Sequence, residues 1–523
     1  MSAHRLQLGP TPAPAAYGGR SALVALVVVA VLAFSTRLTL LLRGGGLSGS
    51  NGYDDSVYMA AAIALVHGQL PYRDFVLLHP PGILLALAPF AGLSQLVSDR
   101  TGQEIARLAF MALGALNAVL VLRLGSRFGR VAGLAGGVVY AVSFPALWSE
   151  RTTTLEALGN TTVLVALVLL VDPARRRLGA GSSRRWGRGW HWPTGLLVGV
   201  GAALGFGTTV KIWGVVALAL LVVWVGLTAG LRAAAWLIAA AGATIVAVCL
   251  PFFLAAPGAM WRMVVVDQVG RPRNVSSLES RLTTIVGLTA WRPYVPPLVL
   301  QLALLVGLAV LVAAVVVVAR TVGALVVVVL LLAHLGVLLV SPNGYLHYAT
   351  LAWAPGAVVL GIAADRGWER LRARGHPTGA TVGLAAVLVG LTLYGAPGVL
   401  AGKGLPLHPS LATAASRVPG CITADDPAYL ISMNVLSRNY RHGCPVWIDP
   451  TGIAIDRGGL TGTEPYAVRS NPLWQDDVMT YLLSGEATMV EREATNLNRD
   501  SRATINELPI IFKKSGFGLR RVR

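Results

Sequence analysis

The chain has 523 residues, of which 54% are hydrophobic and 13% charged, and its mean hydropathy is +0.64. A soluble protein of this length carries about a quarter charged residues, so the composition excludes a soluble globular chain. The formal net charge of +19 comes mainly from arginines in short loops between apolar segments. That distribution is typical of membrane topology signals and not of a nucleic-acid-binding face.

Residues 1–20 are rich in Pro and Ala and are predicted to form a disordered cytoplasmic tail. The apolar runs that follow can each cross a hydrocarbon core of about 30 Å, which predicts an α-helical polytopic membrane domain at 21–400 with about 11 spans. The expected spans are 21–42, 102–123, 131–148, 158–171, 194–209, 212–229, 233–255, 295–318, 321–340, 348–364 and 379–399. The arginines occupy alternate loops, so the N-terminus is predicted inside and the C-terminus outside a bacterial plasma membrane.

The first outer loop, residues 43–101, carries the densest polar chemistry of the chain, within Gly52–Gly82. A helix is predicted from Asp54 to His67, where Gly68 ends it. A second apolar helix at 82–97, opened by Pro80-Pro81, is interpreted as interfacial or re-entrant, because counting it as a span would invert every later loop.

The acids of this loop have two interpretations. Asp54 and Asp55 precede an apolar helix, where an acid is a favoured N-cap. Asp74 lies in the same loop, however, and Glu156 follows at the next outer junction, near the start of an apolar helix. Carboxylates that converge from separate outer loops indicate a general base, a metal site, or both.

Several cations are expected on the same outer side. Lys211 lies between two apolar half-spans, where its ammonium would pair with a phosphate, which we favour, or with a structural carboxylate. Arg271 and Arg273 of the GRPRN stretch either bind phosphate through their guanidinium groups or belong to a solvated face. His347 and Tyr348 lie at another outer mouth, as interface-belt residues or as part of a site.

From residue 401 the apolar periodicity ends, and residues 401–523 are predicted to form a small extracytoplasmic α/β domain. CITADDPAYLISMNVLSRN followed by CPVWIDPTG is interpreted as strand, helix and strand. Cys421 and Cys444 would each open a strand, in a compartment where disulfides persist, and are predicted to pair. Cys249 lies within a span and is expected to be a packed thiol.

The stretch GYDDSVYMAAAIALVHGQLPYRDFVLLHPPG resembles the first outer loop of the GT-C superfamily of integral-membrane glycosyltransferases. It is most similar to the protein mannosyltransferases, the aminoarabinose transferases and related actinobacterial enzymes. The matching residues are Asp54, Asp55, Tyr58, Pro80 and Pro81. ERTTTLEALGN resembles the second acidic loop of that family, with Glu156 as its acid, and Lys211 resembles a lysine between two short helices. His79 departs from the aminoarabinose transferases, which carry a lysine before the Pro-Pro pair.

The resemblance implies transfer of a sugar from a polyprenyl-phosphate-linked donor to an envelope glycan, lipid or protein, by a single displacement that inverts the anomeric centre. Asp54 is then the catalytic base, and we expect Asp55 and Glu156 to orient the acceptor or to hold a divalent cation. A divalent cation such as Mg²⁺ or Mn²⁺ would be held by Asp54 and Glu156. The candidate substrate-binding residues are Tyr58, Arg73, Asp74, His79, Lys211, Arg271, Arg273, His347 and Tyr348.

Two other classes of function are compatible with the sequence. A lipid or solute transporter would line a path with intramembrane charges near the midplane, whereas the acids here gather at one face. A non-catalytic scaffold would use the C-terminal domain to bind a partner. The predicted gathering of acids and cations favours an enzyme.

Overall fold

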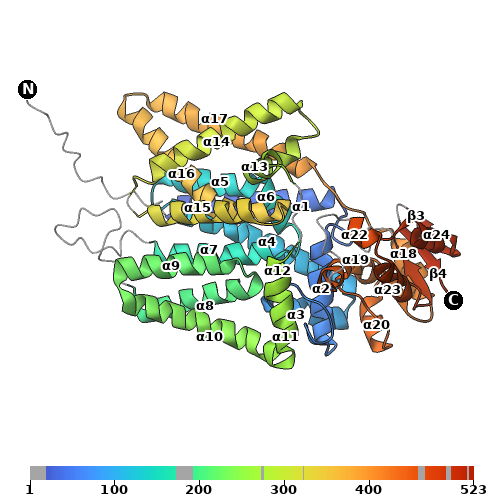
Figure 1. Cartoon of the computed structure of the whole chain (residues 1–523). Coiled ribbons are helices and arrows are strands. Elements are labelled where there is room, and N and C mark those ends of the chain that lie inside the picture. The colour runs from blue at the N-terminus through green and yellow to red at the C-terminus, as the bar shows by residue number, and fades with distance from the viewer. Residues whose placement is uncertain are drawn as a thin grey trace, which may run out of the picture.

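The computed structural model shows a bundle of long apolar helices with a smaller α/β segment at one end (Figure 1). It describes residues 19–171, 192–271, 276–321, 323–457, 466–490, 496–514 and 517–523. Most of the predicted tail, residues 1–18, lies outside the described residues, and Gly19 and Arg20 already belong to the first helix. Residues 401–523 are called the C-terminal segment. The end of the helix bundle against which this segment packs is called the capped end.

The predicted α-helical membrane fold is confirmed, because each expected span is helical. The helices are α1 (Gly19–Leu42), α4 (Asp99–Gly125), α5 (Arg130–Val142), α7 (Leu155–Leu170), α8 (Thr194–Val210), α9 (Gly214–Ala229), α10 (Leu231–Ala255), α14 (Pro297–Val318), α15 (Leu325–Val340), α16 (Thr350–Ala373) and α17 (Pro377–Leu400). Within the described ranges, five helices are long and apolar enough to span a membrane alone, or six if one bent pair counts as a span. Shorter apolar helices, among them α7, α8, α9 and α15, pack between them.

The first loop forms two helices at the capped end, the largely buried α2 (Tyr53–Val66) and the partly buried α3 (Gly82–Leu96). Helix α3 begins after Pro81, as expected, whereas α2 begins at Tyr53, one residue before the prediction. Its N-cap is Gly52, and no side chain caps it. The N-cap interpretation of Asp54 and Asp55 is therefore wrong: both acids lie inside the first turn, where the positive end of the helix dipole favours anions.

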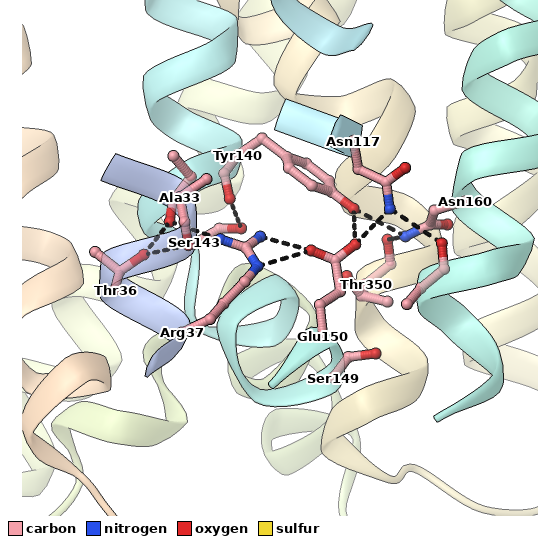
Figure 2. A network of polar contacts seen from close by, with 12 residues as sticks. Ala33, Thr36, Arg37, Asn117, Tyr140, Ser143, Ser149, Glu150, Asn160 and Thr350 are labelled. Atoms are coloured by element: carbon pink, nitrogen blue, oxygen red, sulfur yellow. Dashed lines mark hydrogen bonds and ion pairs between the residues drawn. The ribbon is translucent and has the colours of Figure 1, made fainter. Parts of the chain in front are cut away.

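A bent helix pair turns the chain into the capped end. Helix α6 (Phe144–Glu150) starts after Ser143 and is inclined by 60° to α5. Glu150 Oε2 accepts from Arg37 Nε at 3.0 Å and Nη2 at 2.5 Å, while Asn117 and Tyr140 each donate to Oε1 at 2.7 Å (Figure 2). Each oxygen of this buried carboxylate is satisfied, so the network attaches α6 to α1 and directs residues 151–154 toward the first loop.

Short elements connect the remaining spans. They are α11 (Pro257–Trp261), the π-helix η2 (Arg262–Val266), α12 (Asp267–Val269), α13 (Leu278–Val286), η3 (Leu288–Trp291) and η4 (Leu346–Ala349). Lys211 ends α8 with an extended backbone, which separates α8 from α9. Residues 211, 271 and 345–348 therefore lie close to the ends of helices.

The C-terminal segment holds a four-stranded sheet in the order β1-β2-β4-β3, with β1 and β2 parallel and the other neighbours antiparallel. Its elements are α18 (Pro409–Ser416), β1 (Ile422–Ala424), α19 (Pro427–Ser432), α20 (Leu436–Arg441), α21 (Pro450–Asp456), α22 (Tyr466–Arg469), α23 (Pro472–Leu482), β2 (Ala487–Met489), α24 (Arg499–Glu507), β3 (Ile510–Lys514) and β4 (Phe517–Arg521). A disulfide joins Cys421 and Cys444, whose Cα atoms are 5.6 Å apart.

The strand expected at Cys444 is wrong, since residues 444–449 are irregular and lead directly into α21. Pro445 has no backbone N–H to donate to a ladder. Asp449 instead caps α21 by accepting from Gly452 N at 2.8 Å. The residues after Cys444 therefore form a helix entry and not a sheet edge.

The C-terminal segment and the first loop share one hydrophobic core. Met59 and Leu77 of the loop belong to the same buried cluster as Leu430 and Ile448. Polar contacts join the two parts as well: Ser50 and Leu405 exchange backbone hydrogen bonds, and Ser437 N donates to Asp99 Oδ2 at 2.9 Å. The C-terminal segment is thus packed onto the capped end and fixes the position of its own residues there.

Candidate active site

A cavity of about 410 Å³ opens at the capped end, where α2, the 148–154 turn and the C-terminal segment meet. Four groups of residues line it: the start of α2, the 77–79 and 148–154 turns, the 271 and 345–348 helix ends, and the entry of α21. The lining residues are Asn51, Gly52, Tyr53, Asp54, Asp55, Val57, Tyr58, Leu77, Leu78, His79, Trp148, Arg151, Thr152, Thr154, Arg271, Tyr345, His347, Tyr348, Asp449 and Thr451. Segments far apart in sequence therefore place acids, cations and aromatic rings around one space.

Asp54 is the carboxylate of this cavity that is most open to a ligand. Its side chain is 40% exposed, and the imidazole of His347 lies beside it, with Nε2 3.5 Å from Asp54 Oδ2. The first turn of α2 holds the Asp54 backbone, and packing of His347 against Tyr345 and Tyr348 holds the imidazole. A carboxylate held in this way can accept a proton from a hydroxyl group.

Asp55 has the opposite surroundings. Its Oδ1 accepts from Thr153 N at 2.9 Å and Thr153 Oγ1 at 2.8 Å, and its Oδ2 pairs with the buried guanidinium of Arg107. Burial alone would raise the pKa of Asp55, but the Arg107 charge and the Thr153 donors lower it below its usual value. Asp55 is therefore a buried anion that ties α2 to α4 and to the 151–154 turn.

Glu156 and Lys211 form a buried pair beside the cavity. Lys211 Nζ lies 2.5 Å from Glu156 Oε1, and it also lies over the ring of Tyr348 at 3.8 Å from the centroid. Of the two interpretations left open by the sequence, the structural carboxylate is the partner that Lys211 has in the structure. Glu156 Oε2 is buried and has no hydrogen-bond partner among the described residues.

The other predicted cations and polar residues divide between the cavity and the surface. Arg271 and His79 line the cavity, whereas Arg73 pairs with Asp74 at 2.7 Å with half of the Arg73 side chain exposed. Neither Arg73 nor Asp74 reaches the cavity. Arg273 lies outside the described residues.

His79 is a neutral ring in the cavity wall. Burial, followed by the charges of Lys211 and Arg271, lowers the pKa of His79 well below its usual value. Its ring lies against Tyr58 in an edge-to-face arrangement, with 5.8 Å between centroids. A neutral imidazole supplies hydrogen bonding but no charge, so His79 does not replace the lysine of the aminoarabinose transferases as a cation.

Several residues that line the cavity were not predicted from the sequence. Arg151 donates to Asn51 O at 2.9 Å and stacks on Trp148, with 3.6 Å from its guanidinium carbon to the ring centroid. Asp449 accepts from Tyr53 OH at 2.7 Å across 396 positions of sequence. The position of Arg151 beside Glu150 was a usable signal, but no local pattern connects Asp449 to the first loop.

The two acids expected to hold a divalent cation have other neighbours in the structure. Such an ion takes several oxygen ligands, but in the part of the chain that the structure describes no three His, Cys, Asp or Glu side chains are grouped to hold a metal. Glu156 Oε1 pairs with Lys211 and His347 lies beside Asp54, while Glu156 Oε2 has no hydrogen-bond partner among the described residues. The divalent cation expected at Asp54 and Glu156 therefore stays a prediction.

Comparisons with known proteins identify the family. The sequence profile of glycosyltransferase family 87 matches residues 77–342, slightly more than half of the chain. No curated protein sequence matches the chain. The solved structure of ArnT from Cupriavidus metallidurans bound to undecaprenyl phosphate is similar over 97% of this chain and 99% of that chain, with a TM-score of 0.59 and 14% identity. The Archaeoglobus fulgidus oligosaccharyltransferase tethered with an acceptor peptide is similar over 80% of this chain and 59% of that chain, with a TM-score of 0.52 and 11% identity. These likenesses show the GT-C fold, and the chain belongs to glycosyltransferase family 87, which makes it a membrane glycosyltransferase.

Proposed function

We propose that the enzyme transfers a sugar from a polyprenyl-phosphate-linked donor to a hydroxyl group of an acceptor in the bacterial cell envelope, with inversion of the anomeric centre. The observation that carries this proposal is the Asp54 carboxylate, open in a 410 Å³ cavity that also contains Arg271. A base and a phosphate-binding cation in one cavity are what a displacement from a sugar phosphate requires. Membership in an enzyme family decides against the transporter and the scaffold.

Asp54 acts as the general base in this proposal. It takes the proton of the acceptor hydroxyl while the acceptor oxygen forms a bond to the anomeric carbon. The bond from that carbon to the phosphate oxygen breaks on the opposite face, and the polyprenyl phosphate leaves with the electron pair. His347, with Nε2 3.5 Å from Asp54 Oδ2, orients the carboxylate.

Arg271 receives the departing phosphate. It lines the cavity, and no ion pair holds it to a carboxylate among the described side chains. Burial opposes the charge of Arg271, but Tyr348 and Tyr345, and then the Asp54 and Asp449 carboxylates, raise its pKa above the usual value, so the guanidinium stays charged. A planar guanidinium binds two phosphate oxygens at once and stabilises the charge that develops there.

The Glu156–Lys211 pair supports the cavity in this account and does not take part in the chemistry. Its two charges lie 2.5 Å apart, and Lys211 is 8% exposed. The ammonium over the Tyr348 ring holds an aromatic residue that lines the cavity on its other side. Asp55 has a similar supporting role at the opposite wall through Arg107 and Thr153.

The polyprenyl-phosphate donor and the location rest on two supporting observations. The ArnT structure, which shares the fold over almost the whole chain, contains undecaprenyl phosphate. The arginine-rich loops of the sequence assign the capped end to the extracytoplasmic side, with the N-terminus in the cytoplasm. The donor then reaches the cavity from the membrane and the acceptor from outside.

Transfer by the purified chain tests the proposal. The full-length enzyme, in liposomes, is given undecaprenyl phosphates that carry mannose, glucose or arabinose, together with octyl glycosides as acceptors. We expect one donor to yield a new glycoside of inverted anomeric configuration and an equivalent amount of free undecaprenyl phosphate. Absence of transfer with every donor, or a product of retained configuration, would contradict the proposed function.

A further inference from the structure

The C-terminal segment contributes one carboxylate to the cavity, that of Asp449. Hydrogen bonds from both α2 and α21 fix its position. Asp449 Oδ1 accepts from Tyr53 OH at 2.7 Å and from Gly452 N at 2.8 Å. The Tyr53 hydroxyl in turn accepts from Thr451 N at 3.0 Å. Tyr53 is the first residue of α2 and precedes Asp54, so these bonds set the α21 entry at a constant position relative to the proposed base.

Only one oxygen of Asp449 is used by these contacts. No described residue donates a hydrogen bond to Oδ2, while the side chain lines the same cavity as Asp54 and Thr451. Asp449 is only partly buried, and a carboxylate has capacity for several donors, so Oδ2 can accept a hydrogen bond from a ligand in the cavity. Desolvation, together with the Asp54 charge, raises the pKa of Asp449 above its usual value.

We propose that Asp449 Oδ2 accepts a hydrogen bond from a second hydroxyl group of the acceptor, so that the C-terminal segment determines which acceptors are used. This inference rests on the proposed function. The acceptor hydroxyl that reacts lies at Asp54, and a neighbouring hydroxyl of the same molecule lies at Asp449. The enzyme therefore requires an acceptor with at least two hydroxyl groups at a set spacing.

The charge and position of Asp449 favour the acceptor over the donor. A carboxylate repels the donor phosphate, for which Arg271 supplies the matching charge on the cavity wall. Asp449 lines the cavity from the C-terminal segment, and that segment lies at one end of the bundle (Figure 1), whereas a lipid-linked donor enters from the bundle side. A site that hydrogen-bonds a substrate hydroxyl strongly rejects analogues that lack it.

The test variant is Asp449→Asn in the full-length enzyme. Asparagine is a good N-cap, so its carbonyl oxygen can keep the bonds from Tyr53 and Gly452 while the second oxygen becomes an N–H donor. Asp477→Asn is the matched control, because Asp477 is a carboxylate of the same segment that is half exposed and pairs with Arg457 away from the cavity. Both variants are assayed with the undecaprenyl-phosphate donor that the wild type uses, and with octyl glycosides and their monodeoxy derivatives.

We expect Asp449→Asn to raise the KM for the glycoside about 10- to 100-fold, the usual loss for a hydrogen bond to a charged group, with kcat and the donor KM within about twofold of wild type. For wild type and Asp477→Asn, kcat/KM for one monodeoxy acceptor should be about 10-fold or more below the value for the parent glycoside. For Asp449→Asn, the same comparison should show a much smaller difference. An unchanged acceptor KM, a change in the donor KM instead, or equal discrimination against every deoxy acceptor would overturn the inference. A wild-type enzyme without transfer would instead count against the proposed function.

Discussion

Asp54 and Asp55 are adjacent in sequence, but their carboxylates lie in opposite surroundings. The Asp54 side chain is 40% exposed in the cavity and lies 3.5 Å from His347, whereas the Asp55 side chain is 1% exposed and pairs with Arg107. Successive residues of a helix point about 100° apart, which lets one turn of α2 supply both an open acid and a buried one. Substitution of the two acids should therefore separate chemistry from stability.

Asp55→Asn should destabilise the protein, while Asp54→Asn should not. Without the Asp55 charge, the buried Arg107 guanidinium keeps only neutral acceptors, and breaking such a pair costs about 3–5 kcal/mol. Thermal unfolding of both variants in detergent measures the difference. Equal melting temperatures for Asp55→Asn and wild type would contradict the structural role of Asp55.

The pKa of Asp55 also determines how the stability difference between wild type and Asp55→Asn depends on pH. The pKa of Asp55 is lowered from 3.8, so the stabilisation from its charge is complete above that value and is lost only as the pH falls through the lower, folded-state pKa. The stability gap between wild type and Asp55→Asn should thus be constant from about pH 5 to 8 and should shrink in stronger acid. A gap that closes between pH 7 and 5 would contradict the lowered pKa.

The Glu156–Lys211 pair should show strong coupling. Lys211→Met leaves a buried Glu156 carboxylate without its cation, and Glu156→Gln leaves a buried ammonium, so each single variant should lose about 3–5 kcal/mol. The double variant has no charge at this place and should recover part of the loss. A thermodynamic cycle of unfolding free energies measures the coupling, and additive losses would show that the two residues act independently.

Arg271 and Arg73 should differ in donor binding. Arg271→Ala should raise the KM for the polyprenyl-phosphate donor at least about 10-fold, since it removes a charge-assisted phosphate contact. Arg73→Ala removes a half-exposed guanidinium that is paired with Asp74, and should leave the donor KM unchanged. If both variants, or neither, altered the donor KM, the assignment of the phosphate to Arg271 would be wrong.

His79 should make folding less favourable in mild acid. Its pKa is lowered well below 6.5, so below that pH the unfolded chain binds a proton that the folded protein does not, and stability falls by up to about 1.4 kcal/mol per pH unit. His79→Gln should remove this part of the loss between pH 6.5 and 5. A parallel fall in melting temperature for wild type and His79→Gln would indicate a His79 of ordinary pKa.

The lengths of the apolar segments, and the residues that start or end helices, were enough to predict the helices. The Pro80-Pro81 start of α3 and the spans flanked by arginines follow from local rules, and the fold class is confirmed. The Cys421–Cys444 pair was likewise predictable, but the strand after Cys444 was not, because Asp449 makes this stretch the entry of a helix.

The surroundings of side chains depend on contacts between distant segments. Sequence alone left Lys211 between a phosphate and a carboxylate, and the contact with Glu156 comes from the packing of α7 against α8. Asp449 could not be foreseen, because the core shared by the first loop and the C-terminal segment brings it to Tyr53 across 396 positions. Helix periodicity could not show which of Asp54 and Asp55 is buried, since that depends on Arg107 of α4.

The most direct test of the account is the turnover of Asp54→Asn compared with Asp74→Asn, an acid of the same loop that pairs with Arg73 outside the cavity. With a saturating polyprenyl-phosphate donor and acceptor, kcat of Asp54→Asn should fall about 10²- to 10⁴-fold, the usual contribution of a general base. Donor binding and melting temperature should stay at the wild-type level, and Asp74→Asn should turn over normally. An Asp54→Asn enzyme that retained full turnover would contradict the assignment of Asp54 as the base.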